Sequence, residues 1–341
     1  MTPQEITPGI EAIEYWLPPE VVTNEDLAKE FSDWSPQKAF RATGIRQRHI
    51  GREPASDMIV HAAEKLFDLH NTDRSSIDCL LVVTQTRDYP MPAAACIVQD
   101  KLGLSKSCAA MDIMMGCSGW VYALYVARAL LASGSCRRLL LCTAEKTCHQ
   151  HPKDKSTRVT FGEAATATLL SCCENPLATL GEFDLGTDGS GALNLYVPAG
   201  GSALPRSPET ARETVDESGN VHSLDTLFMD GMEIFSFSTR EAPKTIDAAL
   251  AKNGLTRDDV ALFVLHQANR MILETLRGKM QIDPERWVID LEDIGNTSSC
   301  TIPIALRNRM NGLKAGDNVL ISGFGIGYSW ASAVLKWRRS S

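Results

Sequence analysis

The sequence predicts an α/β protein built from two duplicated halves. Strand-like and helix-like patterns alternate along the chain, and three strand-to-helix steps recur in the same order in each half. A length of 341 residues with 44% hydrophobic content is enough for one large core or two fused domains. No low-complexity linker divides the chain, and the repeat places the two halves at residues 1–175 and 176–341.

The first and third steps of the repeat are strands. Residues 77–83 are matched by residues 260–265, and each apolar segment enters a polar turn followed by a helical pattern. Residues 138–142 are matched in the same way by residues 318–322. A polar stretch rich in Gly and Pro, at 198–223, is expected to form a surface excursion.

The second step of the repeat pairs two short turns. A Gly-Cys-Ser turn around Cys117 precedes a predicted helix at 120–133, and a Gly-Asn-Thr turn around Asn296 precedes one at 302–310. If a pseudo-twofold axis relates the halves, the matching turns meet at their interface. His266 directly follows a predicted strand, where reactive groups gather in open α/β sheets. We therefore expect Cys117, His266 and Asn296 to form one cluster.

Charge and segment composition limit the class of protein. The net charge of −8 argues against a general nucleic-acid binder, because phosphates demand an excess of Lys and Arg. The N-terminal segment lacks the basic and apolar regions of a signal peptide, and no apolar run approaches the roughly 20 residues that span a bilayer. We expect a cytoplasmic protein with neither nucleic-acid nor membrane partners.

Cys117 is the candidate nucleophile. Ten cysteines in a cytoplasmic chain are expected to be reduced thiols that serve mainly as small buried residues. Cys117 differs because Gly116 and Gly119 flank the start of the predicted helix, whose positive end would stabilise a thiolate. Its backbone N–H can also donate to a developing oxyanion. The alternative is a buried structural cysteine, as expected for the others.

His266 and Asn296 are candidate hydrogen-bond donors. A neutral imidazole beside an Asn amide would form an oxyanion site without adding charge near the thiolate. Taken alone, His266 could be a satisfied core histidine, and Asn296 is more typical of a turn. Their positions after a buried strand and within the repeat favour the catalytic interpretation.

Two other motifs do not indicate a cofactor or metal site. The Gly-rich segment 323–327 is not a dinucleotide-binding loop, because a strand-like pattern at 330–337 follows it in place of a helix. Such a loop is suited to bringing backbone N–H groups close to a substrate. Cys148, His149 and His151 have no zinc-ligand spacing and are expected to lie in a loop.

The ordered motifs resemble the β-ketoacyl-ACP synthase III family of condensing enzymes, and the resemblance covers nearly the whole chain. The most specific motifs are Cys117-Ser118-Gly119, His266-Gln267-Ala268-Asn269 and Gly295-Asn296-Thr297-Ser298. The resemblance implies a thiolase-like fold, in which the two α/β halves pack as a layered αβαβα sandwich. A thiolase would carry a second catalytic cysteine in the C-terminal Gly-rich loop, and elongating ketosynthases use two histidines. The set Cys117, His266 and Asn296 matches neither pattern and favours the initiating type.

The resemblance also implies a two-stage reaction. An acyl group passes from a thioester to Cys117, and malonyl-ACP then loses carbon dioxide. His266 and Asn296 would hold the malonyl thioester oxygen, and the carbanion would attack the acyl group on Cys117. The acyl oxyanion would lie between the N–H groups of Cys117 and Ile326, where typical members carry glycine in place of isoleucine.

Substrates and partners follow from the same resemblance. The family uses acyl-CoA or acyl-ACP and malonyl-ACP, needs no cofactor, and forms homodimers in which Met91 would close the acyl pocket of the mate. Substrate or CoA contacts would come from Trp34, Lys155, Met91, Phe324 and Asn269. Arg270 would dock the carrier protein, because Met271 replaces the usual arginine. A short insertion after Trp34 and the lysine at 155 depart from the family pattern.

Two further hypotheses remain at this stage. The scaffold could transfer the acyl group from Cys117 to a hydroxyl or amine, which the unusual CoA and carrier contacts motivate. It could also be a non-catalytic subunit or a redox-sensing thiol protein, which the filled catalytic positions disfavour.

Overall fold

The computed structural model describes residues 7–31 and 34–339. The strands of these residues are β1 (Gly9–Trp16), β2 (Glu20–Thr23), β3 (Gln47–Ile50), β4 (Cys79–Val83), β5 (Ala109–Ile113), β6 (Arg138–Glu145), β7 (Ala164–Ser171), β8 (Ala178–Thr187), β9 (Leu195–Tyr196), β10 (Thr214–Val215), β11 (Val221–His222), β12 (Phe228–Met229), β13 (Val260–Leu265), β14 (Asn318–Gly325) and β15 (Ser329–Trp337). The α-helices of the same residues are α1 (Asn24–Glu30), α2 (Pro36–Thr43), α3 (Ala55–His70), α4 (Ala94–Lys101), α5 (Gly119–Ala132), α6 (Lys155–Thr160), α7 (Gly231–Lys252), α8 (Arg270–Met280) and α9 (Thr301–Arg309).

One mixed sheet runs through the molecule in the order β13-β14-β15-β8-β1-β7-β6-β4-β5. The series β4-β6-β7-β1 and the series β13-β14-β15-β8 each begin with a parallel pair and continue with two antiparallel pairs. The two series join where β1 pairs with β8. A parallel bridge from Phe263 to Trp287 occupies the place beside β13 that β5 occupies beside β4. The strand order thus has the internal symmetry expected from the sequence repeat.

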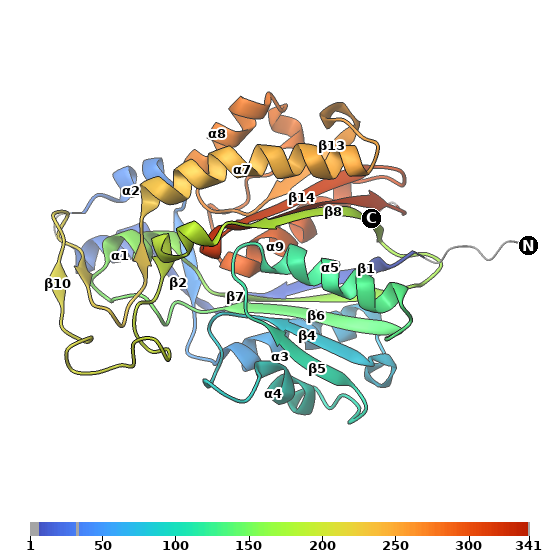
Figure 1. Ribbon diagram of the computed structural model, residues 1–341, viewed down its shortest axis with the longest axis horizontal. Helices are drawn as coiled ribbons and strands as arrows, with labels where there is room; N and C mark the ends of the chain where they lie inside the picture. Colours follow the sequence, from blue (N-terminus) through green and yellow to red (C-terminus); the bar gives the residue numbers. More distant parts are fainter. Residues whose placement is uncertain (1–6, 32–33, 340–341) are drawn as a thin grey trace, which may run out of the picture.

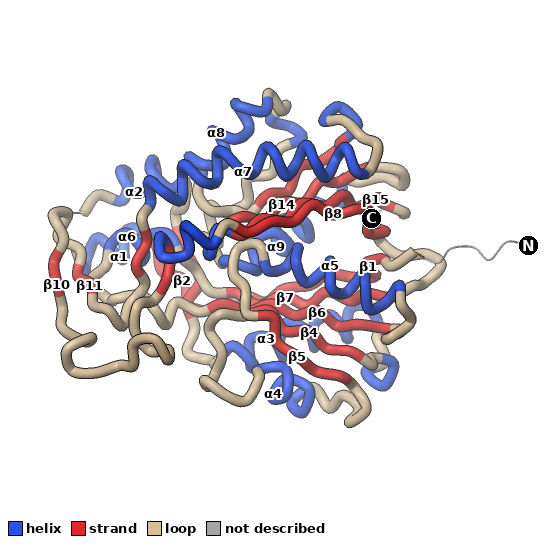
Figure 2. Tube along the Cα trace, in the orientation of Figure 1, coloured by secondary structure: helices blue, strands red, loops and turns tan. Residues whose placement is uncertain are grey.

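The elements stack in five layers (Figure 1; Figure 2). Helices α3 and α4 lie outside the strands β5, β4, β6, β7 and β1. Helices α5 and α9 lie between these strands and the strands β8, β15, β14 and β13, and α7 covers the other side. The layered αβαβα sandwich predicted from the resemblance is confirmed.

The central layer contributes two largely buried helices to the core. Helix α5 buries Trp120 and Leu124, and α9 buries every residue from 301 to 306. A helix covered on two sides must be apolar on most of its surface, which explains the composition of α5. Each fully buried large side chain of this kind contributes about 1.5–3 kcal/mol of hydrophobic stabilisation.

The predicted elements agree with the structure except at several ends. The strands β6 and β14 each run three residues beyond the predicted ranges 138–142 and 318–322. Their antiparallel partners keep pairing there, up to Glu145 with Ala164 and Gly325 with Ser329. The excursion at 198–223 carries the small hairpin β10-β11 at the left of Figure 1. Among the described helices, none is both long enough and apolar enough to cross a bilayer.

Candidate active site

Cys117 lies in the short connection between β5 and α5. Its side chain is nearly buried, with 8% exposed, and its Sγ is 4.0 Å from the Ser298 hydroxyl. Gly325, at the end of β14, packs directly on it: a Cβ at Gly325 would lie 2.7 Å from Sγ. The nucleophile predicted from the N-terminal half therefore contacts two segments of the C-terminal half.

Burial disfavours the thiolate form of Cys117, which differs from the stabilised thiolate that was expected. Burial raises the pKa of Cys117 above its ordinary value. The N–H of Ile326, the Ser298 hydroxyl and the N–H of Cys117 itself act in the opposite direction, but they do not outweigh burial. The expectation of a stabilised thiolate was wrong because it considered the helix start without the desolvation.

His266 follows β13 and is completely enclosed. Burial lowers the pKa of its imidazole to about 3, so the ring is neutral at physiological pH. Its Nδ1 lies 2.7 Å from the Thr301 hydroxyl, and its ring meets Phe324 edge to face at 5.9 Å between centroids. The neutral imidazole expected from the sequence is present, and Phe324 shapes its pocket.

Asn296 sits in a turn that is fixed from both halves. Its backbone N–H donates to the carbonyl of Thr160, and its own carbonyl accepts from Gly162. Gly295 adopts a φ of +78°, which glycine tolerates without strain. The side-chain Oδ1 accepts the N–H of Ser298 at 2.9 Å, which leaves Nδ2 as the donating end of the amide.

Ser298 joins the three predicted residues into one set of contacts. Its hydroxyl faces Cys117, its N–H binds Asn296, and its carbonyl lies 3.0 Å from the hydroxyl of Thr301, which in turn reaches His266. The single proton of Thr301 can serve either the carbonyl of Ser298 or Nδ1 of His266. Neither Ser298 nor Thr301 was predicted as a site residue from the sequence, although Ser298 belongs to the Gly-Asn-Thr-Ser motif.

The Gly-rich segment 323–327 forms the wall behind the thiol. A Cβ at Gly323 would lie 2.7 Å from the Cα of Ser118, so this strand end packs against the backbone around Cys117. The N–H of Ile326 points at Cys117 and is one of the groups that lower the pKa of its thiol. The expected role of this loop, close approach of backbone N–H groups, agrees with its position.

Glu145 is a buried acid that sequence reasoning missed. It ends β6 and is close enough to Cys117 for an electrostatic interaction. Burial raises its pKa to about 8, against a weaker opposite effect from the Ser299 hydroxyl, which donates to it at 3.1 Å. Its carboxyl is therefore mostly neutral near pH 7. A lone Glu after a long apolar strand was the available signal.

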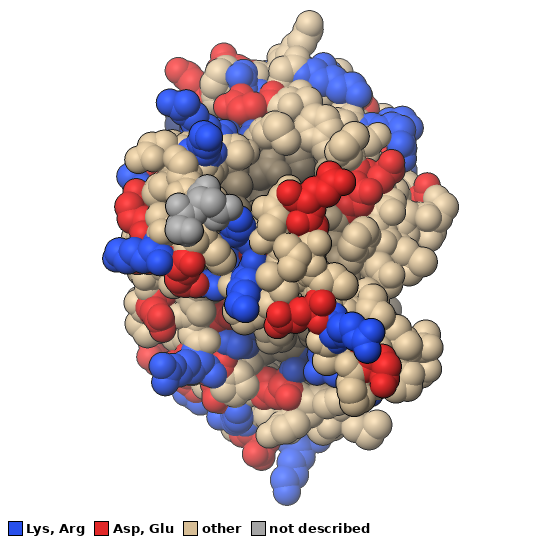
Figure 3. Space-filling view, turned by 90° about the vertical axis from the view of Figure 1, so that its left-hand side faces the viewer, with Lys and Arg blue, Asp and Glu red and all other residues tan. Residues whose placement is uncertain are grey.

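The predicted CoA contacts, Trp34 and Lys155, lie just before α2 and at the start of α6. Trp34 packs edge to face with Phe31, and Lys155 begins α6 and reaches the carbonyl of Ser218. Helices α1, α2 and α6 gather on the left side of Figure 2, which has the orientation of Figure 1, and Figure 3 shows this side face on. This face carries Lys and Arg side chains around a hollowed centre, with Asp and Glu interspersed.

Asn269, Arg270 and Met91 occupy three different surroundings. The side-chain oxygen of Asn269 caps α8 by accepting the N–H of Ile272 at 2.8 Å. Arg270 lies over the ring of Phe40 and pairs with Glu292, with part of its side chain exposed. Met91 is 81% exposed.

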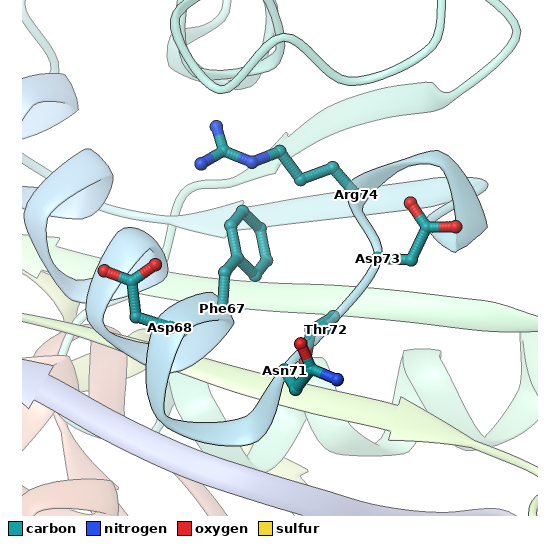
Figure 4. Close-up of a pocket in the computed structure, with 6 residues that line it drawn as sticks. All are labelled: Phe67, Asp68, Asn71, Thr72, Asp73 and Arg74. Atoms are coloured by element: carbon teal, nitrogen blue, oxygen red, sulfur yellow. The ribbon is translucent and has the colours of Figure 1, made fainter.

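A cavity of about 450 Å³ lies at the end of α3, lined by Phe67, Asp68, Asn71, Thr72, Asp73 and Arg74 (Figure 4). The chain enters β4 at Cys79, shortly after Arg74, so the cavity lies near the amino end of that strand. Cys117 and His266 lie instead beyond the carboxyl ends of β5 and β13, the end of a parallel sheet where substrates bind. The cavity is thus separate from the candidate active site.

Replacing Gly325 by Ala tests the contact behind the thiol. The new Cβ would lie 2.6 Å from Cβ of Cys117, so we expect a loss of about 1–3 kcal/mol in the free energy of unfolding and slower alkylation of Cys117. Gly278→Ala is the control, because a Cβ there meets nothing within 4 Å. Denaturant unfolding and iodoacetamide labelling measure both effects. Equal behaviour of the two variants would contradict the packing.

Replacing Glu145 by Gln tests the buried neutral acid. Because the pKa of Glu145 rises from 4.5 to about 8 on folding, the folded chain retains a proton that the unfolded chain releases between these pH values. The stability of the parent protein therefore falls as pH rises through this window. The Gln variant lacks this loss, and its advantage should grow to a few kcal/mol at about pH 8. Parallel pH profiles of the melting temperature would rule out the raised pKa.

Comparisons with known proteins identify the family of the chain. A family model described as 3-oxoacyl-[acyl-carrier-protein (ACP)] synthase III matches residues 111–189, and the model of its C-terminal part matches residues 250–337. The chain is 36% identical over 341 residues to the beta-ketoacyl-[acyl-carrier-protein] synthase III of Caldanaerobacter subterraneus subsp. tengcongensis, covering 98% of this chain and 99% of that protein.

Solved structures give the same family and the same fold. A crystal structure of a 3-oxoacyl-(acyl-carrier-protein) synthase III superposes with a TM-score of 0.94 at 41% identity, covering 97% of this chain and 100% of the other. A 3-oxoacyl-(acyl-carrier protein) synthase from Burkholderia xenovorans LB400 superposes with a TM-score of 0.88 at 33% identity, covering 97% and 94%. The thiolase-like fold predicted from the sequence is confirmed. The chain belongs to the 3-oxoacyl-[acyl-carrier-protein] synthase III family of acyltransferases.

Proposed function

We propose that this acyltransferase condenses an acyl thioester with malonyl-ACP by decarboxylative Claisen condensation, through an acyl group on Cys117. The observation that supports this most is the contact set of Ser298, which connects Cys117, Asn296 and, through Thr301, His266. The names of the relatives support a role in fatty-acid biosynthesis. The reaction needs only its thioester substrates and no cofactor.

The first half-reaction loads Cys117. Burial disfavours the free thiolate, so the proton of the thiol passes to the departing thiolate as sulfur attacks the thioester carbonyl and the carbon–sulfur bond of the donor breaks. The oxyanion that forms on the carbonyl lies between the N–H groups of Cys117 and Ile326. Both groups already face the sulfur in the free protein, so little reorganisation is needed.

The second half-reaction uses the two neutral donors. Nε2–H of His266 and Nδ2 of Asn296 donate to the thioester oxygen of the malonyl group while carbon dioxide leaves and an enolate forms. For Nε2 to carry the proton, Nδ1 of His266 accepts from Thr301, 2.7 Å away. The enolate carbon then attacks the acyl carbonyl, the bond between that carbonyl and the sulfur of Cys117 breaks, and the released thiolate takes a proton from water.

The substrates and the carrier protein would approach from the face in Figure 3. Trp34 and Lys155 are the proposed contacts for the CoA part of the donor. Arg270 is the proposed contact for the acidic carrier protein, although its pairing with Glu292 and its position over Phe40 restrain the guanidinium. Phe324 would line the active site through its contact with His266. Asn269 would act at most indirectly, because its side-chain oxygen caps α8.

The protein would act as a homodimer built on the free edge of β5. This strand ends the sheet order, and a strand edge left unpaired favours pairing with another chain. Met111, on β5, and Met114, just after it, are exposed, as are Tyr89 and Met91 in the connection before α4. Met91 would then reach the acyl pocket of the partner subunit.

The division into halves at 1–175 and 176–341 remains a prediction, as does the cytoplasmic location.

The acyl adduct on Cys117 is the direct test of this function. Incubation with a panel of acyl-CoA and acyl-ACP donors should add one acyl mass to the peptide that carries Cys117, and malonyl-ACP should then release a ketoacyl-ACP and carbon dioxide. Cys117→Ala should show no adduct. Intact mass spectrometry follows both steps. An ester or amide product without carbon dioxide would replace condensation by acyl transfer to a hydroxyl or amine.

Asn296→Ala separates the two half-reactions. Removing one donor from an oxyanion site costs about 10²–10³ in rate, so decarboxylation of malonyl-ACP should fall by that factor while the acyl adduct still forms. Asn318→Ala is the matched control, because the side chain of Asn318 donates to Asp259 at the other end of the sheet. Release of labelled carbon dioxide measures the second half-reaction alone. A loss confined to loading of Cys117 would show that Asn296 serves a different step.

A further inference from the structure

The turn that carries the N–H of Ile326 has glycine on both sides of that residue. Ile326 lies between Gly325 and Gly327, and Gly327 adopts a φ of +73°. Glycine on both sides leaves a backbone segment with more conformational freedom than other residues allow. A bond from outside the turn would therefore help to keep this N–H aimed at Cys117.

Ser329 supplies that bond. Its hydroxyl donates to the carbonyl of Ile326 at 2.9 Å, and its oxygen lies 2.7 Å from the hydroxyl of Ser118. Because the one proton of Ser329 goes to Ile326, the proton between the two serines comes from Ser118. A directed chain thus runs from Ser118 through Ser329 to the backbone of Ile326. Both serines are buried, so water does not replace these bonds.

The position of Ser118 strengthens this interpretation. Serine at the start of a helix usually accepts a hydrogen bond from the first turn, yet Ser118 precedes α5 and makes no such capping bond. Its hydroxyl turns instead to Ser329, 211 residues away in sequence. Since Ser118 directly follows Cys117, the chain of hydroxyls ties the backbone of the nucleophile to the turn that faces it.

We propose that Ser118 and Ser329 are positioning residues that hold the N–H of Ile326 on the sulfur of Cys117. The inference rests on the proposed function for its catalytic meaning, because this N–H is one of the two donors to the acyl oxyanion. The pair itself touches no substrate. Its effect is carried through the carbonyl of Ile326, which restricts the rotation of that residue.

A second serine pair provides a matched comparison. The hydroxyl of Ser332 donates to that of Ser322 at 2.8 Å, and both side chains are fully buried. Ser322 lies on β14 and Ser332 on β15, the two strands that the turn connects. This pair contacts no carbonyl of the turn. If Ser118 and Ser329 merely satisfied each other inside the core, changing either pair would have the same consequences.

The test is the pH dependence of Cys117 alkylation by iodoacetamide in the full-length protein, followed by peptide mass spectrometry. Ser329→Ala should raise the apparent pKa of Cys117 and slow its alkylation at neutral pH roughly tenfold, because a charged sulfur loses an aligned donor. Ser332→Ala should leave the profile of the parent protein. Ser329→Thr retains the hydroxyl and should restore the parent profile. Glu145, the acid that interacts with Cys117, is unchanged in every variant.

Ser118→Ala removes the other end of the chain and gives a second reading if Ser329→Ala does not fold. Identical alkylation profiles for Ser329→Ala, Ser118→Ala and Ser332→Ala would overturn the proposal, as would failure of Ser329→Thr to restore the parent profile. This measurement needs no acyl substrate. Absence of a ketoacyl product together with a shifted alkylation profile would refute the proposed function and leave the positioning role standing.

Discussion

Burial of the site between the two strand series of the sheet is the constraint on which its chemistry depends. The turns that carry Cys117 and Asn296 precede the central helices α5 and α9, so both approach the site from a layer that is covered on two sides. Desolvation then acts on every ionisable group there: it lowers the pKa of His266 and raises those of Cys117 and Glu145. At neutral pH all three groups are mainly uncharged.

A site of neutral groups must be held together by hydrogen bonds and packing, because no ion pair among the described residues orients it. Ser298 meets this need by contacting residues from both halves, and it adopts a positive φ of 52° that side-chain-bearing residues rarely take. Such strain persists where surrounding contacts fix the backbone. The bond from its N–H to Asn296 and the contact of its hydroxyl with Cys117 provide that fixation.

The sequence repeat predicted the topology because it records which strands are equivalent, and equivalence determines where Cys117 and Asn296 meet. It could not predict how far β6 and β14 extend, since this depends on partner strands distant in sequence. The roles of Glu145, Thr301 and Ser329 could not be predicted from the sequence for a related reason. A hydroxyl or carboxyl gains a role only from the atoms packed around it, and no spacing along the chain records those atoms. The error about the thiolate has the same origin.

Isoleucine at 326 is the departure that the structure explains best. Its backbone N–H still faces Cys117, and its side chain lies toward Gly116, where an added Cβ would come within 3.0 Å of Cγ2 of Ile326. Gly116 is thus required by Ile326 as well as by the approach of Gln85. A β-branched residue also restricts its own backbone, in a turn that two glycines make flexible. The bulk at 326 and the hydroxyl of Ser329 therefore act on the same rotation, one from within the turn and one from the strand that follows it.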